Sequence, residues 1–435
     1  MRVLHLATDD TAGGAARAAY RQHTALRRHG VDSEMFVRHK HSNDMSVVQY
    51  VGNSNTAHRA ARVLRRAWIS YQEKQSRKHC RTIMCGLNDP RADLLRSVDR
   101  RIAEADVINI HKVGHFVDIP AFLSHVGSSK PVVITMHDLS AITGGCDYPG
   151  SCARFEASCG RCPIIGSKLS ADYSHRIFRM KQKAYRALAP TQLTFVANSR
   201  WSAEHASRSG LVNGASVELI HYGIDQSVYN PERRQEAREA LGIGTGEQVL
   251  LFAAHDIGLK HKGGYLLAEA LAAVAQQKKF RVLTMGSGQL ESNAASPFIH
   301  FGRVESDKLQ VLLYRAADVF VMPSLEEAFG QTALEAVACG TVVAGFDVGG
   351  IVDIVKTGLN GKLVERANVT ALSEAISELL SDHALRMRWQ LSCEIWVQGH
   401  FSYAKNAAAY TELYKSLFRG SSLAVADRTI GDWSR

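Results

Sequence analysis

Short apolar runs that end in polar, glycine-bearing loops recur along the chain, and segments with helical spacing follow them. The clearest case is 319–350, where an apolar run, VFVM, ends at Pro323 and a polar loop leads into the amphipathic segment 331–339, closed by Gly340. Such a run predicts a buried parallel strand, and Gly340 is a typical helix stop. The helix therefore begins at a strand's carboxyl edge, where open α/β sheets bind ligands and free helix N–H groups favour phosphate.

The same pattern predicts further elements on both sides of this stretch. Expected strands lie at 3–7, 105–110, 131–136, 195–197, 249–253 and 281–285. Expected helices lie at 15–29, 59–81, 232–241 and 403–418. The first strand is followed by a polar loop containing Gly13 and Gly14, which would let backbone approach a ligand at a helix start, although a plain turn fits equally well.

Composition places the chain among ordinary globular proteins of two to three domains. Of its 435 residues, 46% are hydrophobic and 22% charged, which argues against extensive disorder. No apolar run approaches the roughly 18 residues that a membrane-spanning helix needs. The N-terminus enters a strand pattern directly and lacks the apolar core and cleavage site of a signal peptide, so we expect a cytoplasmic protein.

The net charge of +10 is concentrated in the first half of the chain. Residues 1–225 hold 31 Lys and Arg against 19 Asp and Glu, whereas 226–435 hold 21 against 23. The stretch 59–81 has eight basic residues against one Glu, with apolar residues at helical spacing, and 176–186 is a second basic stretch. Two interpretations of 59–81 remain open: docking on an anionic membrane surface, or a packed helix with a solvated charged face.

Two carboxylates flank the start of the helix at 331–339. Glu327 lies in the loop and Glu335 within the helix, with seven residues between them. One hypothesis is that both face a polyhydroxylated ligand, because carboxylates accept hydrogen bonds from paired hydroxyls while backbone N–H groups hold a diphosphate. The alternative is a pair of solvated surface acids.

The residues from Pro323 to Ala336 resemble the signature of a known enzyme family. They read P-S-x-x-E-x-F-G-x-x-x-x-E-A, and Gly340 and the pair 349–350 follow. This resembles the EX7E signature of retaining glycosyltransferases of family four, which have the GT-B fold. The resemblance implies an α/β protein with two Rossmann-like domains facing a cleft and a C-terminal helix that crosses back to the first domain.

The stretch 218–230 resembles the family's interdomain linker with its Gly-Ile-Asp, and it sets the expected domain bounds. We expect an acceptor-side domain at 1–225 with a cysteine-rich insert at 144–163, a nucleotide-sugar domain at 226–395, a crossover helix at 396–418 and a tail at 419–435.

The resemblance also assigns site residues. Glu327, His137 and Lys262 are expected at the reacting centre, with Glu327 on the donor sugar and His137, next to Asp138, helping to position it. The glycine-rich loop at Gly13 and Gly14 is expected to face the cleft. The remaining expected donor contacts are Glu335 on the ribose, together with Phe329, Gly330, Gln331, Gly286, Gly288 and Arg303.

The chain departs from the family in the segment 253–264. Family members carry an Arg and a Lys that grip the donor diphosphate, but only the Lys-Gly half is present, as Lys262 and Gly263. His255 and Asp256 stand where the Arg is expected, which leaves neutralisation to Lys262, helped by Lys260 or His255. Thr341 replaces a usual Pro and Asp353 a usual Glu.

The segment 144–163 contains four cysteines, Cys146, Cys152, Cys159 and Cys162, at spacings x5, x6 and x2. Disulfides are disfavoured in the cytoplasm, so the thiols either hold a structural zinc ion or pack a loop in reduced form. The segment resembles one found after the His-Asp of some exopolysaccharide and colanic-acid-type transferases, and acceptor contact near the cleft mouth follows from that resemblance.

The predicted function is transfer of a hexose from a nucleoside diphosphate sugar, with retention, to a saccharide or lipid-linked saccharide in cell-surface polysaccharide assembly. No DxD-type metal motif stands in the expected setting, so catalysis should need no cofactor. Peripheral contact with the anionic inner membrane face is a further expectation. The alternatives are another GT-B enzyme, such as a nucleotide-sugar epimerase, or a basic nucleic-acid-binding module. A nucleic-acid-binding module would need aromatic side chains for base stacking or a recognised nucleic-acid motif. The sequence shows neither, so no nucleic-acid partner is expected.

Overall fold

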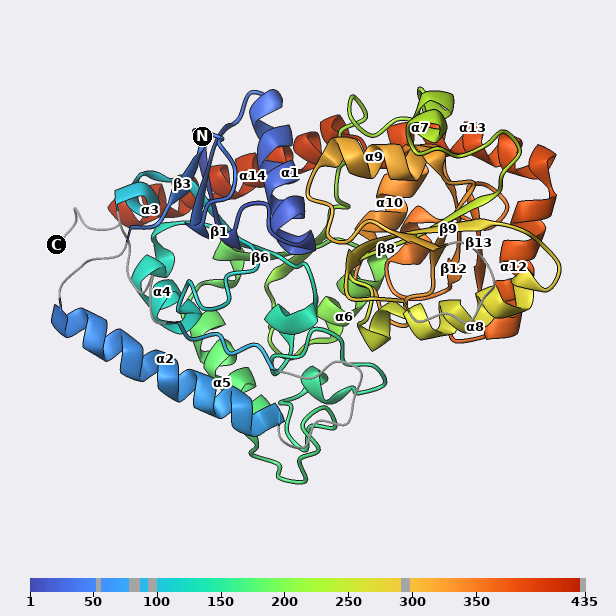
Figure 1. Cartoon of the computed structure of the whole chain (residues 1–435). Helices are drawn as coiled ribbons and strands as arrows, with labels where there is room; N and C mark the ends of the chain where they lie inside the picture. The colour runs from blue at the N-terminus through green and yellow to red at the C-terminus, as the bar shows by residue number, and fades with distance from the viewer. Residues whose placement is uncertain (52–55, 78–86, 93–99, 291–297, 431–435) are drawn as a thin grey trace. The chain divides into compact units, whose positions relative to one another are not determined.

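The computed structural model describes residues 1–51, 56–77, 87–92, 100–290 and 298–430. The chain folds into two compact units: residues 1–222 together with 406–435 form the first, and residues 223–405 form the second. Each unit is built on a parallel sheet flanked by helices (Figure 1).

The described strands of the first unit form a seven-stranded sheet in the order β3-β2-β1-β4-β5-β6-β7. Neighbouring strands are parallel throughout. The central strands are mostly apolar because both faces of such a sheet are covered. The strands are β1 (Arg2–Asp9), β2 (Asp32–His39), β3 (Val47–Gln49), β4 (Val107–Ile110), β5 (Val132–Thr135), β6 (Leu193–Ala197) and β7 (Ser216–Leu219).

Helices from distant parts of the sequence cover this sheet. They are α1 (Gly14–Arg28), α2 (Thr56–Arg77), α3 (Arg100–Glu104), α4 (Ile119–Val126), α5 (Tyr173–Tyr185), α6 (Arg200–Arg208) and the C-terminal α14 (Tyr403–Ile430). Figure 1 shows α14, in red, lying beside the strands of the first unit. Two buried tyrosines dock it: the Tyr414 hydroxyl accepts from Asn109 Nδ2 at 2.6 Å, and the Tyr410 hydroxyl lies 3.2 Å from that of Thr135.

The described strands of the second unit form a six-stranded parallel sheet in the order β10-β9-β8-β11-β12-β13. The strands are β8 (Val249–Asp256), β9 (Arg281–Ser287), β10 (Phe298–His300), β11 (Val319–Met322), β12 (Val342–Phe346) and β13 (Gly361–Val364). Its helices are α7 (Arg234–Ala240), α8 (Gly264–Ala275), α9 (Asp307–Ala316), α10 (Gln331–Ala338), α11 (Ile351–Ile354), α12 (Val369–Ser381) and α13 (His383–His400).

The strand order of the second sheet reverses direction at β8. The chain passes from β8 outward through β9 to β10, and then returns to β11 on the other side of β8. Loops that leave β8 and β11 at their carboxyl ends therefore diverge and leave a crevice, which is where open α/β sheets bind ligands.

The C-terminal region differs from the expected crossover helix at 396–418 and tail at 419–435. Residues 396–400 belong to α13, and the chain is interrupted at Phe401, whose carbonyl accepts from Ile224 N at 2.8 Å. Phe401 is buried, so its packing breaks the helix. The following helix α14 continues past Gly420 to Ile430 because a single glycine costs a helix only about 1 kcal/mol.

The basic stretch predicted as a helix at 59–81 forms α2, and 78–81 lies outside the described residues. Among the residues that the structure describes, none of the helices has the length and apolar character needed to span a bilayer.

Candidate active site

The crevice of the second sheet brings two oppositely charged side chains together. Lys262 lies in the loop after β8 and Glu327 in the loop after β11. The Lys262 Nζ donates to Glu327 Oε2 at 2.7 Å, and both side chains are mostly buried. Two residues 65 positions apart in sequence thus form one charged pair at the reversal point of the sheet.

Glycines allow the loops to approach closely enough for this pairing. A Cβ at Gly263 would lie 1.8 Å from the carbonyl oxygen of Pro323, and one at Gly349 would lie 1.9 Å from the carbonyl oxygen of Glu327. Both glycines also have positive φ, 72° and 52°. The backbone contacts that hold the Glu327 loop therefore leave no room for a side chain at either position.

The two helices that start at this edge both begin at a glycine. Gly263 precedes α8 and Gly330 precedes α10, and neither N-terminus has a side-chain cap. A helix N-terminus directs backbone N–H groups and a partial positive charge outward, which suits an anion. With Lys262 beside them, these helix starts place positive charge next to Glu327.

Glu335 lies on α10, and its side chain faces inward. It is only 6% exposed, and the hydroxyl of the buried Tyr314 donates to its Oε2 at 2.8 Å. The sequence pattern around Glu335 does not indicate this partner. A test of ligand binding by Glu335 must therefore distinguish the loss of a ligand contact from the loss of helix packing.

The other predicted donor contacts lie in three places. Phe329 is buried and its ring packs edge-on against that of Phe401, so only its backbone is suited to ligand contact. Gln331 is the first residue of α10. Gly286 lies at the end of β9 and Gly288 directly follows the strand, and both have positive φ. Arg303 is exposed, with its Nε 3.2 Å from Glu305.

In the first unit, the predicted glycine loop precedes α1. Gly13 has a φ of 92° and stands at the N-cap without a side-chain cap, while Gly14 is the first helical residue. A Cβ at Gly13 would meet no atom within 4 Å, so glycine is required there by backbone conformation and not by crowding.

His137 follows β5, and both of its ring nitrogens already have partners. Nε2 lies 3.0 Å from His111 Nδ1, and Nδ1 lies 2.6 Å from the hydroxyl of Tyr222. Burial lowers the pKa of His137 to about 4, so the ring is neutral at pH 7. A substrate atom can hydrogen-bond a ring nitrogen of His137 only by displacing one of these partners.

A charged cluster that the sequence analysis missed stands beside His137. The Lys112 ammonium donates to the carboxylates of Asp138 and Asp147, the second at 2.8 Å. Burial acts to raise the pKa of Asp138, but Lys112 outweighs it and lowers the pKa to about 2. Burial and the neighbouring Asp138 raise the pKa of Asp147 to about 6. Because Asp147 belongs to the cysteine-rich segment, this cluster fastens that segment to the sheet edge.

The four cysteines at 146, 152, 159 and 162 line one pocket with Phe155. All four are unbridged. Burial raises the pKa of the Cys146 and Cys159 thiols to about 12. Within the described residues, no three His, Cys, Asp or Glu side chains are arranged to hold a metal ion. As placed, the thiols pack the segment, and zinc binding stays a prediction.

Comparison with known families finds a match within the second unit. Residues 247–382 match the sequence model of the family glycosyl transferases group 1. This group 1 segment contains Lys262, Glu327 and Glu335, and it spans the second sheet from β8 to α12. The charged pair and the two glycine-opened helices thus lie in the part of the chain that carries the family resemblance.

Two curated relatives overlap the chain in part. D-inositol 3-phosphate glycosyltransferase of Mycobacterium sp. (strain KMS) is 31% identical over 207 residues, which cover 44% of this chain and 46% of the relative. The protein of that name from Mycobacterium bovis (strain BCG / Pasteur 1173P2) is 33% identical over 180 residues, covering 38% and 36%. The chain therefore spans less than half the length of these relatives.

Solved structures match nearly the whole chain. Sucrose-phosphate synthase from Thermosynechococcus elongatus superposes with a TM-score of 0.63 at 18% identity, covering 97% of this chain and all of that one. Anabaena HepE in complex with UDP-glucose gives 0.63 at 16% identity, covering 96% and 100%. At this identity the likeness concerns the fold, and it confirms the predicted α/β class with two Rossmann-like units of GT-B type.

Proposed function

We propose that the protein is a retaining glycosyltransferase that moves a hexose from a nucleoside diphosphate sugar to a saccharide acceptor. The observation that carries the proposal is the Lys262–Glu327 pair, set between two glycine-opened helices at the reversal point of the group 1 segment. Positive charge for a diphosphate and a carboxylate for sugar hydroxyls then stand side by side. The structural neighbour HepE in complex with UDP-glucose supports a donor of this class.

Each of these groups has a separate task. Lys262 and the starts of α8 and α10 neutralise the diphosphate, which supports transfer without a catalytic metal ion. Glu327 accepts hydrogen bonds from donor sugar hydroxyls and orients Lys262. The backbone of Phe329 and Gly330 holds phosphate, and Glu335 holds the ribose.

Retention follows from attack on the face that the leaving group departs from. The acceptor hydroxyl oxygen forms the new bond to the anomeric carbon as the bond to the diphosphate oxygen breaks. The electron pair of that bond stays on the diphosphate, whose oxygen takes the proton of the acceptor hydroxyl. Lys262 lies where this negative charge develops, so its contribution increases toward the transition state.

Calorimetric titration of UDP, GDP and ADP into the purified protein tests the donor site. We expect one nucleotide to bind, and Glu335→Gln to weaken it about tenfold or more because a hydrogen-bonding carboxylate is lost. Tyr314→Phe is the matched control: it removes the buried partner of Glu335 and keeps the carboxylate. Equal losses in the two variants would show that Glu335 acts through packing and would contradict the ribose assignment.

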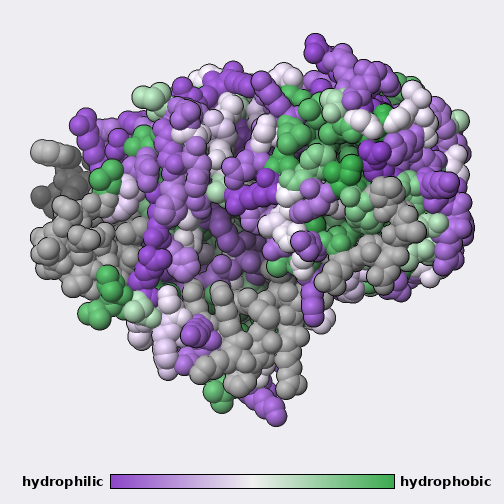
Figure 2. Space-filling model, in the orientation of Figure 1, coloured by the Kyte–Doolittle hydropathy of each residue, from purple (hydrophilic) through white to green (hydrophobic). Residues whose placement is uncertain are grey.

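For the acceptor we propose a lipid-linked saccharide in cell-surface polysaccharide assembly, reached from the inner membrane face. The supporting observation is that α2 turns its apolar stripe outward. Val63, Leu64 and Trp68 are 67%, 72% and 49% exposed, whereas Ile69 on the other side of the helix is buried. Hydrophobic surface appears at the lower left of Figure 2, in the region that α2 occupies in Figure 1.

Arg65 attaches this helix to the rest of the first unit. Its guanidinium donates to the Ala92 carbonyl at 2.9 Å and to the carboxylate of Asp118, which caps α4. Arg65 thus holds α2 against the first unit, while apolar residues of the helix are exposed beside the exposed Arg66 and Lys74. This combination is typical of a helix that lies on the surface of an anionic membrane.

The zinc prediction has a direct test. Metal analysis of protein purified without chelators should find about one zinc per chain if the four thiols close on a metal. A Cys159→Ser, Cys162→Ser variant should lose it. Metal-free protein with unchanged thermal stability would establish the packed-thiol alternative.

A further inference from the structure

The exposed side of α5 carries basic side chains throughout its length. Every exposed residue from Tyr173 to the C-cap Arg186 is basic: Arg176, Arg179, Lys183 and Arg186. Their spacing of three, four and three residues places them on one side of the helix. They lie within about 15 Å along the helix axis. These four residues are called the basic face below.

The opposite side of α5 packs into the first unit and fixes which way the helix faces. Ile177 and Phe178 are fully buried. Lys181, which is also buried, donates to the carbonyl oxygens of Ser140 at 2.5 Å and Thr143 at 3.1 Å. The fourth basic side chain in this stretch of the helix is thus used internally, and the basic face is held toward solvent.

The charges of the basic face are not balanced by neighbouring acids. Arg179 donates to the side-chain oxygen of Gln182 at 2.5 Å, and the Arg176 guanidinium lies 5.6 Å from the centre of the Tyr173 ring. Among the residues that the structure describes, no ion pair includes a member of the basic face.

The surrounding sequence adds almost no negative charge. Residues 157–203 contain eight Lys and Arg against one acid, Asp172. Asp172 is buried, and its carboxylate accepts from Cys162 N at 2.8 Å and from Ser174 Oγ at 2.6 Å. The basic face is therefore a surface of net positive charge, which attracts a partner with several negative charges.

The loop before α5 presents an apolar side chain next to this charge. Leu169 is 71% exposed and Lys168 beside it is also exposed. The backbone of the loop is fixed, because Arg161 N donates to the Leu169 carbonyl at 2.8 Å. A Cβ at Gly160, whose φ is 101°, would lie 2.1 Å from the carbonyl oxygen of Ser170. Leu169 is thus held in solvent by a loop with defined contacts.

The start of α5 is also joined to the exposed part of α2. The Tyr173 hydroxyl donates to Asp89 Oδ2 at 2.5 Å, and Asp89 forms an ion pair with Arg91. The Arg91 guanidinium lies 4.3 Å from the centre of the Trp68 ring. The half-exposed Trp68 of α2 is therefore only a few side chains away from the first turn of α5.

We propose that the basic face and Leu169 are a second docking surface for an anionic bilayer, in which the cations bind lipid phosphates and Leu169 enters the apolar region. The inference rests on the proposed function, whose acceptor is lipid-linked. A soluble polyanion would satisfy the cations, but only a bilayer also removes Leu169 from water. The neighbouring apolar residues of α2 favour the same partner.

Co-sedimentation with vesicles tests the basic face. The vesicles are phosphatidylcholine alone, or an equimolar mixture with phosphatidylglycerol, without nucleotide or acceptor. We expect the variant with Arg179, Lys183 and Arg186 replaced by Gln to bind the mixed vesicles about tenfold more weakly or worse, with a smaller salt dependence.

A matched control removes the same charge elsewhere. In the second unit the exposed residues Lys279, Lys308 and Arg388 are replaced by Gln, and we expect binding to change little. Thermal melts check that both variants keep the fold. Equal losses in the two variants would show that net charge alone drives binding and would overturn the proposal.

Leu169→Ser and Leu391→Ser test the apolar contact. The two leucines are 71% and 72% exposed, and Leu391 lies on α13 in the second unit. We expect Leu169→Ser to weaken binding to the mixed vesicles about tenfold and Leu391→Ser to leave it unchanged. Full vesicle binding by Leu169→Ser, with heparin bound as tightly as vesicles, would assign the basic face to a soluble polyanion instead.

The two proposals fail in different ways. Vesicle binding as expected, without turnover of any nucleotide sugar, would refute the proposed function and leave the docking surface standing. Turnover of a water-soluble saccharide acceptor, with vesicle binding unchanged in the charge variant and in Leu169→Ser, would refute the docking surface alone.

Discussion

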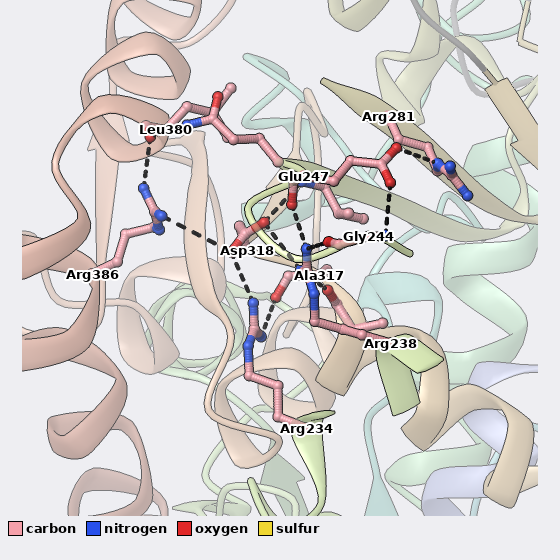
Figure 3. Close-up of polar contacts among 12 residues, drawn as sticks. Arg234, Arg238, Gly244, Glu247, Arg281, Ala317, Asp318, Leu380 and Arg386 are labelled. Atoms are coloured by element: carbon pink, nitrogen blue, oxygen red, sulfur yellow. Dashed lines mark hydrogen bonds and ion pairs between the residues drawn. The ribbon is translucent and has the colours of Figure 1, made fainter. Parts of the chain in front are cut away.

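The two ends of β11 carry charged clusters that differ in how many cations surround the carboxylate. Asp318 stands immediately before the strand, and Glu327 lies in the loop after it. Three arginines form ion pairs with Asp318 (Figure 3): Arg234 and Arg238 on α7, and Arg386 on α13. Glu327 forms an ion pair with Lys262. The amino end of β11 is thus held by a network of ion pairs, whereas its carboxyl end carries the charged pair proposed to bind the donor.

The Asp318 cluster is saturated with partners. Its carboxylate also accepts from Val249 N at 2.8 Å, while Arg234 donates to the Ala317 carbonyl at 2.5 Å and Arg386 to the Leu380 carbonyl at 2.7 Å (Figure 3). Such a network joins two helices to the amino end of the sheet. A ligand that approached Asp318 would have to displace several bonds, whereas one at Lys262 displaces one.

The largest expected effect is on catalysis at the carboxyl end. Glu327→Gln keeps the size of the side chain and removes the charge that orients Lys262 and accepts sugar hydroxyls. We expect kcat/KM to fall by roughly 100-fold to 1,000-fold, with Tm nearly unchanged. Initial rates with saturating acceptor and a thermal melt measure both. If Glu327→Gln lowers the Tm and leaves kcat/KM unchanged, Glu327 has a structural role like that of Asp318.

Asp318→Ala should show the reverse pattern. Removal of the carboxylate leaves buried guanidinium groups without their counter-charge, so we expect the free energy of unfolding to fall by about 3 kcal/mol or more. The kcat/KM of the folded fraction should stay the same. Urea denaturation, with rates measured below the transition, checks this. Loss of rate at full stability would contradict the division between the two ends.

Acid should destabilise the first unit through its buried His137. The folded-state pKa of His137 is lowered from about 6.5 to about 4, so the unfolded chain binds more protons between these values and stability falls as pH falls. The loss amounts to roughly 3 kcal/mol for this group by pH 4. Neighbouring Asp138 opposes the shift, and Lys112 favours it. Unfolding of His137→Gln should depend less on pH over pH 4–6.5, and an unchanged slope would contradict the prediction.

The smallest expected effect concerns α2. Replacing Leu64 and Trp68 with Ser should weaken binding to vesicles containing anionic lipid by about tenfold, and Arg66→Gln with Lys74→Gln by a few-fold. Co-sedimentation measures both. Arg65→Gln is unsuited to this test because Arg65 is bound to Asp118. Unchanged binding in both variants, with the fold intact, would remove the membrane interpretation of α2.

Patterns local to a few residues were enough to predict the alternation of strands and helices and the α/β class, whereas the roles of Lys262, Glu327 and Glu335 were inferred from a resemblance to a family signature and stay predictions. Apolar runs and glycine stops follow from backbone geometry, which each segment carries on its own. β11 lies at its predicted bounds, and the helix expected at 331–339 is α10 (Gln331–Ala338). The end of α14 at Ile430 was not predicted, because Gly420 marked the expected end of the helix and a single glycine does not stop it.

Contacts between distant residues were decided only by the tertiary structure. Spacing cannot show that Tyr314 binds Glu335, or that three arginines from two helices meet Asp318. The clearest case is His137: a residue at a strand end is readable from the sequence, but its hydrogen-bonding role is not. Its ring nitrogens lie within hydrogen-bonding distance of His111 and Tyr222, 26 and 85 positions away, and only the fold places those atoms against the ring.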